Sequence, residues 1–430
     1  MKPAYQYGLL YVLLFINLLL LVPHAGYGFD VNLWTEWAVG IHDYGLSNVY
    51  HQVGNNDYPP LYQYVLFLFG KLAGSTENIH HYQHLLKAFT LLFDFAGAIL
   101  AASLVADHQR RFILSLLLLF NAGYLYNTLV WEQVDAIFTC LTFAAVLLAV
   151  RHEPVWSLLF YVLALNTKPQ AIIFLPALLL LWLPQWLSSA KVLPKALLAA
   201  VALQLLIVAP FVWGGDQNDL NRILDVSFGA VDRYPNISMN AYNFWFMLMP
   251  DANLSYTSDK DIFLVYNYKQ WGLGLFLLAA VITLLPLFII TVRQVLARQR
   301  FAAEQTALIL LTCGLIPLIF SYFNTQMHER YWHAALLFLA AYAFITREYS
   351  LYLITSFAYF LNIEAVIHFL NMKNYGVLLF QPRFAAWLFG IVILIGIWKL
   401  YRQANLRQQW ALMREMGKSI RPHLSMQAAR

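Results

Sequence analysis

The chain has 430 residues, of which 61% are hydrophobic and only 11% are charged, and its mean hydropathy is +0.59. Soluble domains are about 45–50% apolar and about 25% charged, so the composition excludes an ordinary soluble enzyme, a disordered protein and a nucleic-acid binder. The chain also holds 13 Trp and 26 Tyr, residues that gather where a membrane meets water. The composition therefore predicts an all-α polytopic membrane protein.

The net charge of +5 agrees with Lys and Arg concentrated in cytoplasmic loops rather than with a nucleic-acid partner. Cys140 and Cys313 both lie in apolar runs, which argues against a disulfide framework or a cysteine-based zinc site. The first apolar run, residues 7–22, ends at Pro23 without a small-residue cleavage site. We therefore expect an uncleaved first membrane span rather than a signal peptide.

Apolar runs predict about twelve membrane-spanning helices, because a helix needs roughly 20 apolar residues to cross the bilayer. The expected spans are 7–23, 86–106, 112–127, 134–150, 155–166, 169–184, 195–213, 271–292, 305–323, 331–346, 350–370 and 384–401. Several are short, and 155–166 with 169–184 could instead form one broken hairpin. Residues 59–73 are apolar but too few to cross, and they open with Pro59-Pro60. This segment is expected to be a juxtamembrane or re-entrant helix.

Loop charges predict the orientation. If 59–73 does not cross and the N-terminus is cytoplasmic, 17 of the 27 Lys and Arg residues face the cytoplasm, as the positive-inside rule requires. If it crossed, the basic loops 107–111 and 292–300 would face outward. We therefore expect both termini in the cytoplasm, one transmembrane domain over 1–401 and a basic cytoplasmic tail over 402–430. The long loops 24–85 and 214–270 then lie outside the cytoplasm.

The first of these loops carries two carboxylates of interest. Asp30 opens a segment whose apolar positions recur at helical spacing, which predicts an amphipathic juxtamembrane helix. Asp57 precedes Tyr58-Pro59-Pro60. Both positions also suit a simple helix cap, so the local sequence leaves a structural and a functional interpretation open for each.

Further polar strings adjoin later spans on the same predicted side. Residues 130–135 (VWEQVD) place Trp131, Gln133 and Asp135 at the start of a span. These side chains could form part of a site or an interfacial belt. Lys168 lies between two apolar runs, where a cation either reaches the interface or meets an anion. His328 and Arg330 could hold a phosphate, since Arg offers a bidentate fork, or could belong to an ion pair at the rim.

Asp94, Glu364 and His368 lie within expected spans. Asp94 could pair with Lys87 two helical turns away, whereas the other two suggest no specific role. Phosphate-binding, dinucleotide-binding and zinc-protease motifs are absent from the sequence. Histidines 80, 81 and 84 have few carboxylates nearby, so no metal site is expected.

The polar strings occur in an order that resembles the C-type membrane glycosyltransferases, which use polyprenyl-phosphate sugars. The order is Asp30 after the first span, D-Y-P-P-L (57–61), W-x-Q-x-D (131–135), K-P-Q (168–170), N-A-Y-N-F-W (240–245) and H-E-R-Y (328–331). The resemblance covers residues 25 to 335 or so. It points to bacterial mannosyltransferases related to the GPI-anchor mannosyltransferases. It also points to the dolichyl-phosphate-glucose glucosyltransferases of N-glycan assembly.

This resemblance implies a C-type fold and assigns roles to individual residues. Asp30 matches the general base, Asp57 a second acidic position, and His328 and Arg330 the string near the donor phosphate. Two positions depart from the family patterns. Glu132 stands where the bacterial pattern usually has Gly, and Arg330 stands where the N-glycan branch has Lys.

We therefore expect an inverting glycosyltransferase that moves mannose or glucose from a polyprenyl-phosphate carrier to an extracytoplasmic lipid-linked or other glycan acceptor. A phosphate leaving group needs little general-acid help, so one carboxylate can serve as the base. Lys168 would join His328 and Arg330 on the donor phosphate, without a metal or another cofactor. The expected substrate-binding residues are Asp57, Tyr58, Trp37, Trp131, Gln133, Asp135, Asn240 and Asn243.

The loop 214–270, with Asp216, Asp219 and Arg233, is expected to shape the acceptor site. The expected location is a bacterial inner membrane, with the active site on the extracytoplasmic side. Two other interpretations stay open: a transporter or flippase for a lipid or small solute, and an inactive subunit or scaffold. A transporter would place its charged groups at the midplane on broken helices and often shows two related halves, whereas no repeated halves are visible here.

Overall fold

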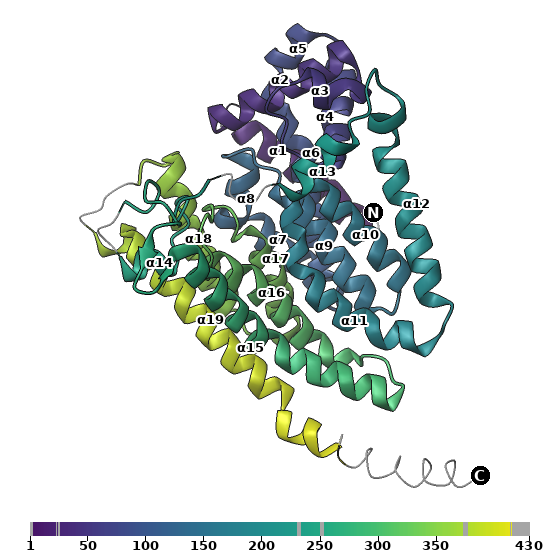
Figure 1. The fold of residues 1–430 in the computed structure, drawn as a ribbon, viewed down its shortest axis with the longest axis vertical. Helices are drawn as coiled ribbons and strands as arrows, with labels where there is room; N and C mark the ends of the chain where they lie inside the picture. Colours follow the sequence, from purple (N-terminus) through teal and green to yellow (C-terminus); the bar gives the residue numbers. More distant parts are fainter. Residues whose placement is uncertain are drawn as a thin grey trace.

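The computed structural model describes residues 3–22, 24, 26–229, 234–249, 253–372, 377–412 and 414. Helices make up about three quarters of the chain, and the only sheet in the described part is a two-stranded hairpin of β1 (Ile262–Phe263) and β2 (Tyr266–Asn267). The structure thus confirms the predicted all-α architecture (Figure 1). Of the predicted basic tail, the residues from 415 onward lie outside the described part of the chain.

Seven of the described helices are long and apolar enough to cross a membrane. They are α6 (Lys87–Ala102), α11 (Leu175–Ser188), α12 (Val192–Trp213), α15 (Tyr268–Ala297), α16 (Thr306–Phe323), α18 (Ser350–Ile367) and α19 (Pro382–Ala404). The short 3-10 helices η2 (Gln83–Leu86), η3 (Pro169–Phe174) and η4 (Ala303–Gln305) extend α6, α11 and α16 at their starts. An eighth candidate is the pair α7 (His108–Leu119) and α8 (Ala122–Leu129), bent by 59°.

The remaining apolar segments form helices too short for a full crossing by length. They are α1 (Pro3–Leu21), of which Tyr5–Leu21 counts as the apolar stretch, α9 (Asp135–Val150), α10 (Pro154–Thr167) and α17 (His333–Thr346). All twelve expected segments are therefore helical, but length and composition support only seven or eight crossings in the described chain. The expected number of twelve is not confirmed, because an apolar run predicts a buried helix as readily as a spanning one.

The centre of the bundle is formed by α9, α16 and α17, with α12 and α19 on its outside (Figure 1). Nearly every residue of α9 and α17 is buried. Of the 18-residue apolar stretch that could span a membrane, 78% is buried inside the protein in α16 but only 28% in α12. Trp332, next to α17, stacks on Phe389 of α19 with ring centroids 3.8 Å apart. The site described below is built on the ends of these central helices.

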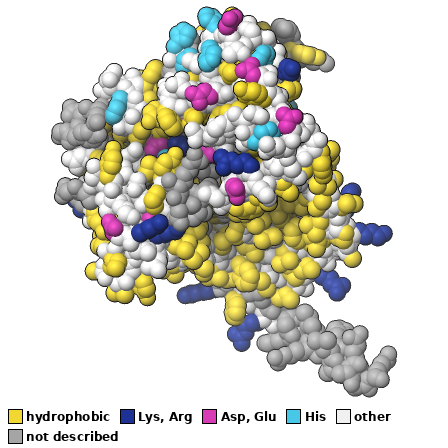
Figure 2. All heavy atoms as spheres, turned by 45° about the horizontal axis from the view of Figure 1, so that its top comes forward, with side chains coloured by type: hydrophobic (Ala, Val, Ile, Leu, Met, Phe, Trp, Pro, Cys, Tyr) yellow, Lys and Arg dark blue, Asp and Glu magenta, His cyan; other side chains and the backbone are white. Residues whose placement is uncertain are grey.

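Short helices from the first long loop gather at one end of the bundle, at the top of Figure 1. They are α2 (Gly28–Tyr44), η1 (Leu46–Asn48), α3 (Val49–Gln52), α4 (Pro60–Ala73) and α5 (Thr76–His81). The region 59–73 forms α4, whose 14 residues are too few to cross a membrane. Figure 2 shows Asp, Glu and His side chains at this end, an apolar band beyond it and Lys and Arg near the far end. This distribution agrees with a cytoplasmic far end, and the orientation itself stays a prediction.

Later loops complete the fold with α13 (Leu220–Phe228), α14 (Phe244–Leu248) and η5 (Leu378–Phe380). The loop before α14 pairs by its backbone with the segment before α17, through bridges of Met239 and Asn240 to His328. Asn362 of α18 joins the two segments. Its Oδ1 accepts the Tyr242 N–H and the Trp332 Nε1–H, each at 3.0 Å, and its Nδ2 donates to the Asn240 carbonyl at 2.8 Å.

We expect Asn362→Leu to lower the thermal unfolding temperature of the detergent-solubilised protein. The substitution leaves two buried N–H donors and one carbonyl without partners, and each lost bond costs about 1–3 kcal/mol. Asn362→Asp keeps the acceptor oxygen and should lie between the wild type and the Leu variant. A Leu variant that unfolds at the wild-type temperature would show that Asn362 does not hold these loops.

Candidate active site

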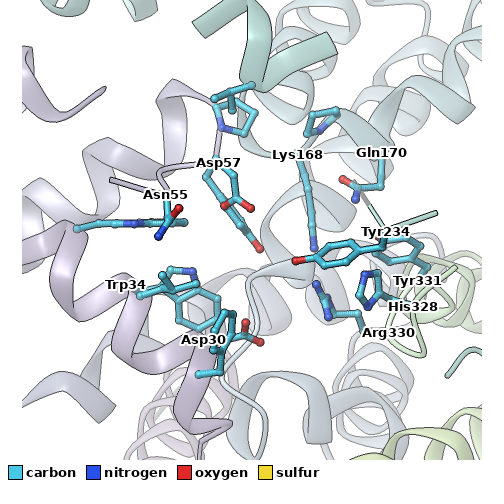
Figure 3. Close-up of a pocket in the computed structure, with 17 residues that line it drawn as sticks. Asp30, Trp34, Asn55, Asp57, Lys168, Gln170, Tyr234, His328, Arg330 and Tyr331 are labelled. Carbon is cyan, nitrogen blue, oxygen red and sulfur yellow. The ribbon is translucent and has the colours of Figure 1, made fainter. Parts of the chain in front are cut away.

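A cavity of about 340 Å³ lies where the first-loop helices meet the ends of the central helices. It brings together segments far apart in the sequence (Figure 3). Five residues predicted for the site from the sequence line this cavity: Asp30, Asp57, Lys168, His328 and Arg330. Tyr58 and Trp37, expected to bind substrate, line it as well.

Asp30 lies in the first turn of α2, where the helix N-terminus favours a carboxylate. The residue in the cap position is Tyr27, and it makes no side-chain capping bond. Asp30 instead accepts hydrogen bonds from two side chains that lie about 100 residues later in the sequence. Its Oδ2 receives Trp131 Nε1–H at 2.9 Å and an N–H of the Gln133 amide. The structure thus favours a site role for Asp30 over a simple cap.

Asp57 and Tyr58 occupy the turn before α4. Pro59, rather than Asp57, is the cap residue of this helix, and Pro60 takes its first position. The turn is fixed by a reciprocal amide pair between the buried Asn56 and Gln63, and Gln63 also donates to the Tyr58 carbonyl at 3.2 Å. This arrangement leaves Asp57 on the cavity wall.

Aromatic rings form one surface of the cavity. The Tyr58 ring lies 5.6 Å from Trp37, 6.5 Å from Trp34 and 5.3 Å from Tyr62, measured between ring centroids. The edge-on and tilted angles are those that aromatic pairs prefer. Lys168 Nζ lies 5.8 Å from the centre of the same Tyr58 ring. A sugar ring could stack on such a surface beside a cation.

The opposite wall carries two cations that share one buried anion. Lys168, just before η3, forms an ion pair with Asp135 at the start of α9. Arg330 Nε lies 4.0 Å from the other Asp135 oxygen, and Asn127 donates to that oxygen at 3.2 Å. Burial lowers the pKa of the Lys168 ammonium, and the Asp135 charge opposes this effect. Asp135 does not line the cavity, so it acts on the cations from behind rather than on a substrate.

The segment 328–331 completes this wall. The Arg330 guanidinium lies over the rings of Trp131 and Tyr331, at 5.7 and 5.8 Å. Its Nη1 is 3.4 Å from Glu329 Oε1, and the Glu329 side chain is 3% exposed. Burial raises the pKa of Glu329 to about 7, against the lowering effect of Arg330. Burial and the nearby cations hold the pKa of His328 well below its usual range, so this imidazole is neutral.

Besides Asp135, four other predicted substrate-binding residues lie outside the cavity lining. Trp131 and Gln133 contact Asp30. Asn240 has a left-handed backbone (φ 65°) and pairs with His328 through its main chain. The Asn243 side chain caps α14 and donates to the carbonyls of Ser321 and Asn324. Their polar groups are engaged in the framework, so the structure favours supporting roles for them.

The loop 214–270 approaches the cavity through Val226 and Tyr234. Asp219 pairs with His51 of α3 at 2.9 Å and thereby ties α13 to the first loop. The backbone N–H of Asp216 donates to Asn48 Oδ1. Arg233 lies outside the described residues.

Several charged residues noted in the sequence make contacts that stabilise the fold. Lys87 Nζ pairs with Glu132 at 2.7 Å, which corrects the suggested pair with Asp94. Asp94 instead faces His333 at 4.0 Å in the bundle interior. Glu364 accepts the Tyr126 hydroxyl and the backbone N–H groups of residues 370 and 372. These contacts anchor the end of α18, where His368 is the cap residue.

The sequence alone assigned no role to Glu329 or Glu132. The only available signal was a carboxylate next to a predicted phosphate-binding Arg and another inside the VWEQVD string. Within the described residues, no group of three or more His, Cys, Asp or Glu is placed to hold a metal ion. The expected independence from metals stays a prediction.

Comparison with protein families gives one finding. Residues 31–228 match the family model described as ALG3 protein, a family of dolichyl-phosphate-mannose-dependent α-1,3-mannosyltransferases. No curated protein matches the chain. The matched stretch includes Asp57, Gln133, Asp135 and Lys168, begins directly after Asp30 and ends well before Arg330. Together with the spanning helices, the match supports a membrane glycosyltransferase of the mannosyltransferase kind.

Proposed function

We propose that the protein is an inverting glycosyltransferase. It takes a hexose from a polyprenyl-phosphate carrier and transfers it to an extracytoplasmic lipid-linked or other glycan acceptor. The family match favours mannose over glucose. The observation that carries the proposal is one cavity with a held carboxylate, Asp30, on one side and two cations, Lys168 and Arg330, on the other (Figure 3).

The charges of the reaction fit this arrangement. The donor phosphate carries one negative charge, and it leaves with the electrons of the bond to the sugar C1. The acceptor hydroxyl attacks C1 from the opposite face, and its proton passes to the Asp30 carboxylate. Both hydrogen bonds from Trp131 and Gln133 fall on Oδ2, so Oδ1 can take this proton. Attack opposite the leaving group inverts the anomeric centre.

Lys168 and Arg330 stabilise the charge that grows on the leaving phosphate. In the structure both cations are balanced by Asp135. Donor binding would turn their N–H groups toward the phosphate, while Asp135 keeps the second face of each cation neutralised. Two buried cations supply the stabilisation that a divalent metal would otherwise give, so we propose a reaction without metal or cofactor.

The proposed setting follows from the loop charges. The cavity lies at the end rich in Asp, Glu and His, away from the end where Lys and Arg gather (Figure 2). We place it on the extracytoplasmic side of a bacterial inner membrane, with both termini in the cytoplasm. A cavity at one end of the bundle suits transfer at the membrane surface better than transport, which needs a site near the midplane.

Asp30→Asn should abolish sugar transfer from polyprenyl-phosphate-mannose to a lipid extract of the host, because the amide cannot accept the acceptor proton. Radiolabel moving into product measures the effect, and we expect at least about a hundredfold loss. Glu36→Gln is the matched control, since Glu36 lies exposed on the same helix. Near-normal transfer by the Asn variant would remove Asp30 as the base.

Arg330→Ala should raise the KM for the donor about 10- to 100-fold, because a charge-assisted hydrogen bond to phosphate contributes about 1.5–3 kcal/mol. Lys168→Met should act in the same direction. Lys71→Met serves as the control, since Lys71 lies exposed at the end of α4. A donor KM that stays at the wild-type value in both cavity variants would contradict a phosphate site on this wall.

The donor KM should also rise with pH above about 7. Below its raised pKa of about 7, Glu329 is protonated and leaves Arg330 to the phosphate. Above it, the carboxylate competes for Arg330, so KM should rise by up to about tenfold per pH unit. Glu329→Gln should flatten this dependence and bind the donor more tightly than the wild type at pH 8. An unchanged slope in the Gln variant would show that another group titrates.

A further inference from the structure

Glu132 stands in an unfavourable backbone conformation between the two side chains that hold Asp30. Its φ is 67°, in the left-handed region that glycine adopts readily and other residues avoid. Its neighbours Trp131 and Gln133 both donate to Asp30 Oδ2. A glycine would suit this backbone better, so the carboxylate at this position needs a separate explanation.

The Glu132 carboxylate makes two contacts with basic side chains, and one of these partners is buried. Glu132 Oε1 is 2.7 Å from Lys87 Nζ and 3.0 Å from His84 Nδ1. The side chains of Glu132 and Lys87 are 3% and 1% exposed, and His84 reaches solvent. An ion pair buried this deeply is costly to break, because removing one partner leaves a charge without compensation.

Lys87 connects this loop to the rest of the bundle. Its Nζ also donates to the carbonyls of Val22 and Leu129, which lie at the ends of α1 and α8. The Tyr27 N–H donates to the Trp131 carbonyl at 3.1 Å, so the start of α2 is tied to the same loop. The loop with Trp131 and Gln133 is therefore fastened both to α2, which carries Asp30, and to the bundle.

The close approach also requires a small residue at Gly26. A Cβ there would lie 3.2 Å from Glu132 Cδ and 2.7 Å from Val31 Cγ2. The chain before α2 thus packs directly against the Glu132 carboxylate and against the helix that carries Asp30. Any shift of Glu132 would reach Asp30 by two routes, through the Trp131 and Gln133 side chains and through this packing.

We propose that Glu132, held by Lys87 and His84, is a positioning residue that keeps Trp131 and Gln133 on Asp30 and so sets the orientation of the base. This inference rests on the function proposed for Asp30. Glu132 touches no substrate, and its effect passes through the two hydrogen bonds on Asp30 Oδ2. Those bonds fix the orientation of the Asp30 carboxylate.

Glu132→Gly is the decisive variant, because it removes the carboxylate while relieving the backbone. We expect kcat to fall about tenfold or more and the donor KM to change less, since Lys168 is held by Asp135 and only Arg330 contacts this loop, through the Trp131 ring. Lys87→Met should give the same pattern. Glu132→Asp keeps the negative charge opposite Lys87 and should recover part of the lost kcat.

Glu348→Gln is the matched control, since this carboxylate pairs with Lys399 away from the cavity. Glu132→Gln replaces the Gly variant if the latter does not fold. Wild-type kcat in Glu132→Gly would overturn the inference, and so would a low kcat that Glu132→Asp does not improve, which would indicate general loosening. Asp30→Asn run in parallel separates the two claims. If that variant keeps its activity the proposed function fails, whereas an inactive Asp30→Asn beside a wild-type-like Glu132→Gly defeats only the positioning role.

Discussion

The site depends on one electrostatic constraint, two buried cations that share the buried carboxylate of Asp135. Lys168 and Arg330 come from segments far apart in the sequence, and Asp135 at the start of α9 pairs with Lys168 and lies 4.0 Å from Arg330. Isolated charges at this depth would be costly, so each of the three needs the others. This requirement joins α9, the turn before η3 and the segment before α17 into one rigid wall, on which a monoanionic phosphate would find its charge already matched.

The carboxylate side of the cavity is joined to this wall by Trp131, which donates to Asp30 and whose ring lies under Arg330. Asp30 belongs to the first-loop helices and is fixed by Trp131 and Gln133, whose loop is anchored in turn by the Glu132–Lys87 pair. Asp30 and the two cations thus come from different elements around a cavity of about 340 Å³. Inverting transfer needs this separation, because the acceptor and the leaving group lie on opposite faces of the sugar.

Much of this architecture follows from the sequence. Long apolar runs predict helices, and loop charge places the polar strings at one end, so Asp30, Asp57, Lys168, His328 and Arg330 could be expected to converge. The number of membrane crossings could not be predicted, because an apolar sequence does not distinguish a helix that faces lipid from one, such as α9 or α17, that is buried among other helices. The sequence also did not show which charged side chains pair with one another. Asp135 meets Lys168 and Lys87 meets Glu132 through tertiary packing, which the spacing of these residues along the chain does not encode.

The anomeric configuration of the product tests the central claim most directly. The purified protein would be given polyprenyl-phosphate-mannose and a lipid-linked acceptor fraction, and NMR would report the new glycosidic bond. Transfer with one base on the face opposite the leaving phosphate predicts the configuration opposite to that of the donor. A product that retains the donor configuration would require a glycosyl–enzyme intermediate or attack from the same face, and would contradict this account.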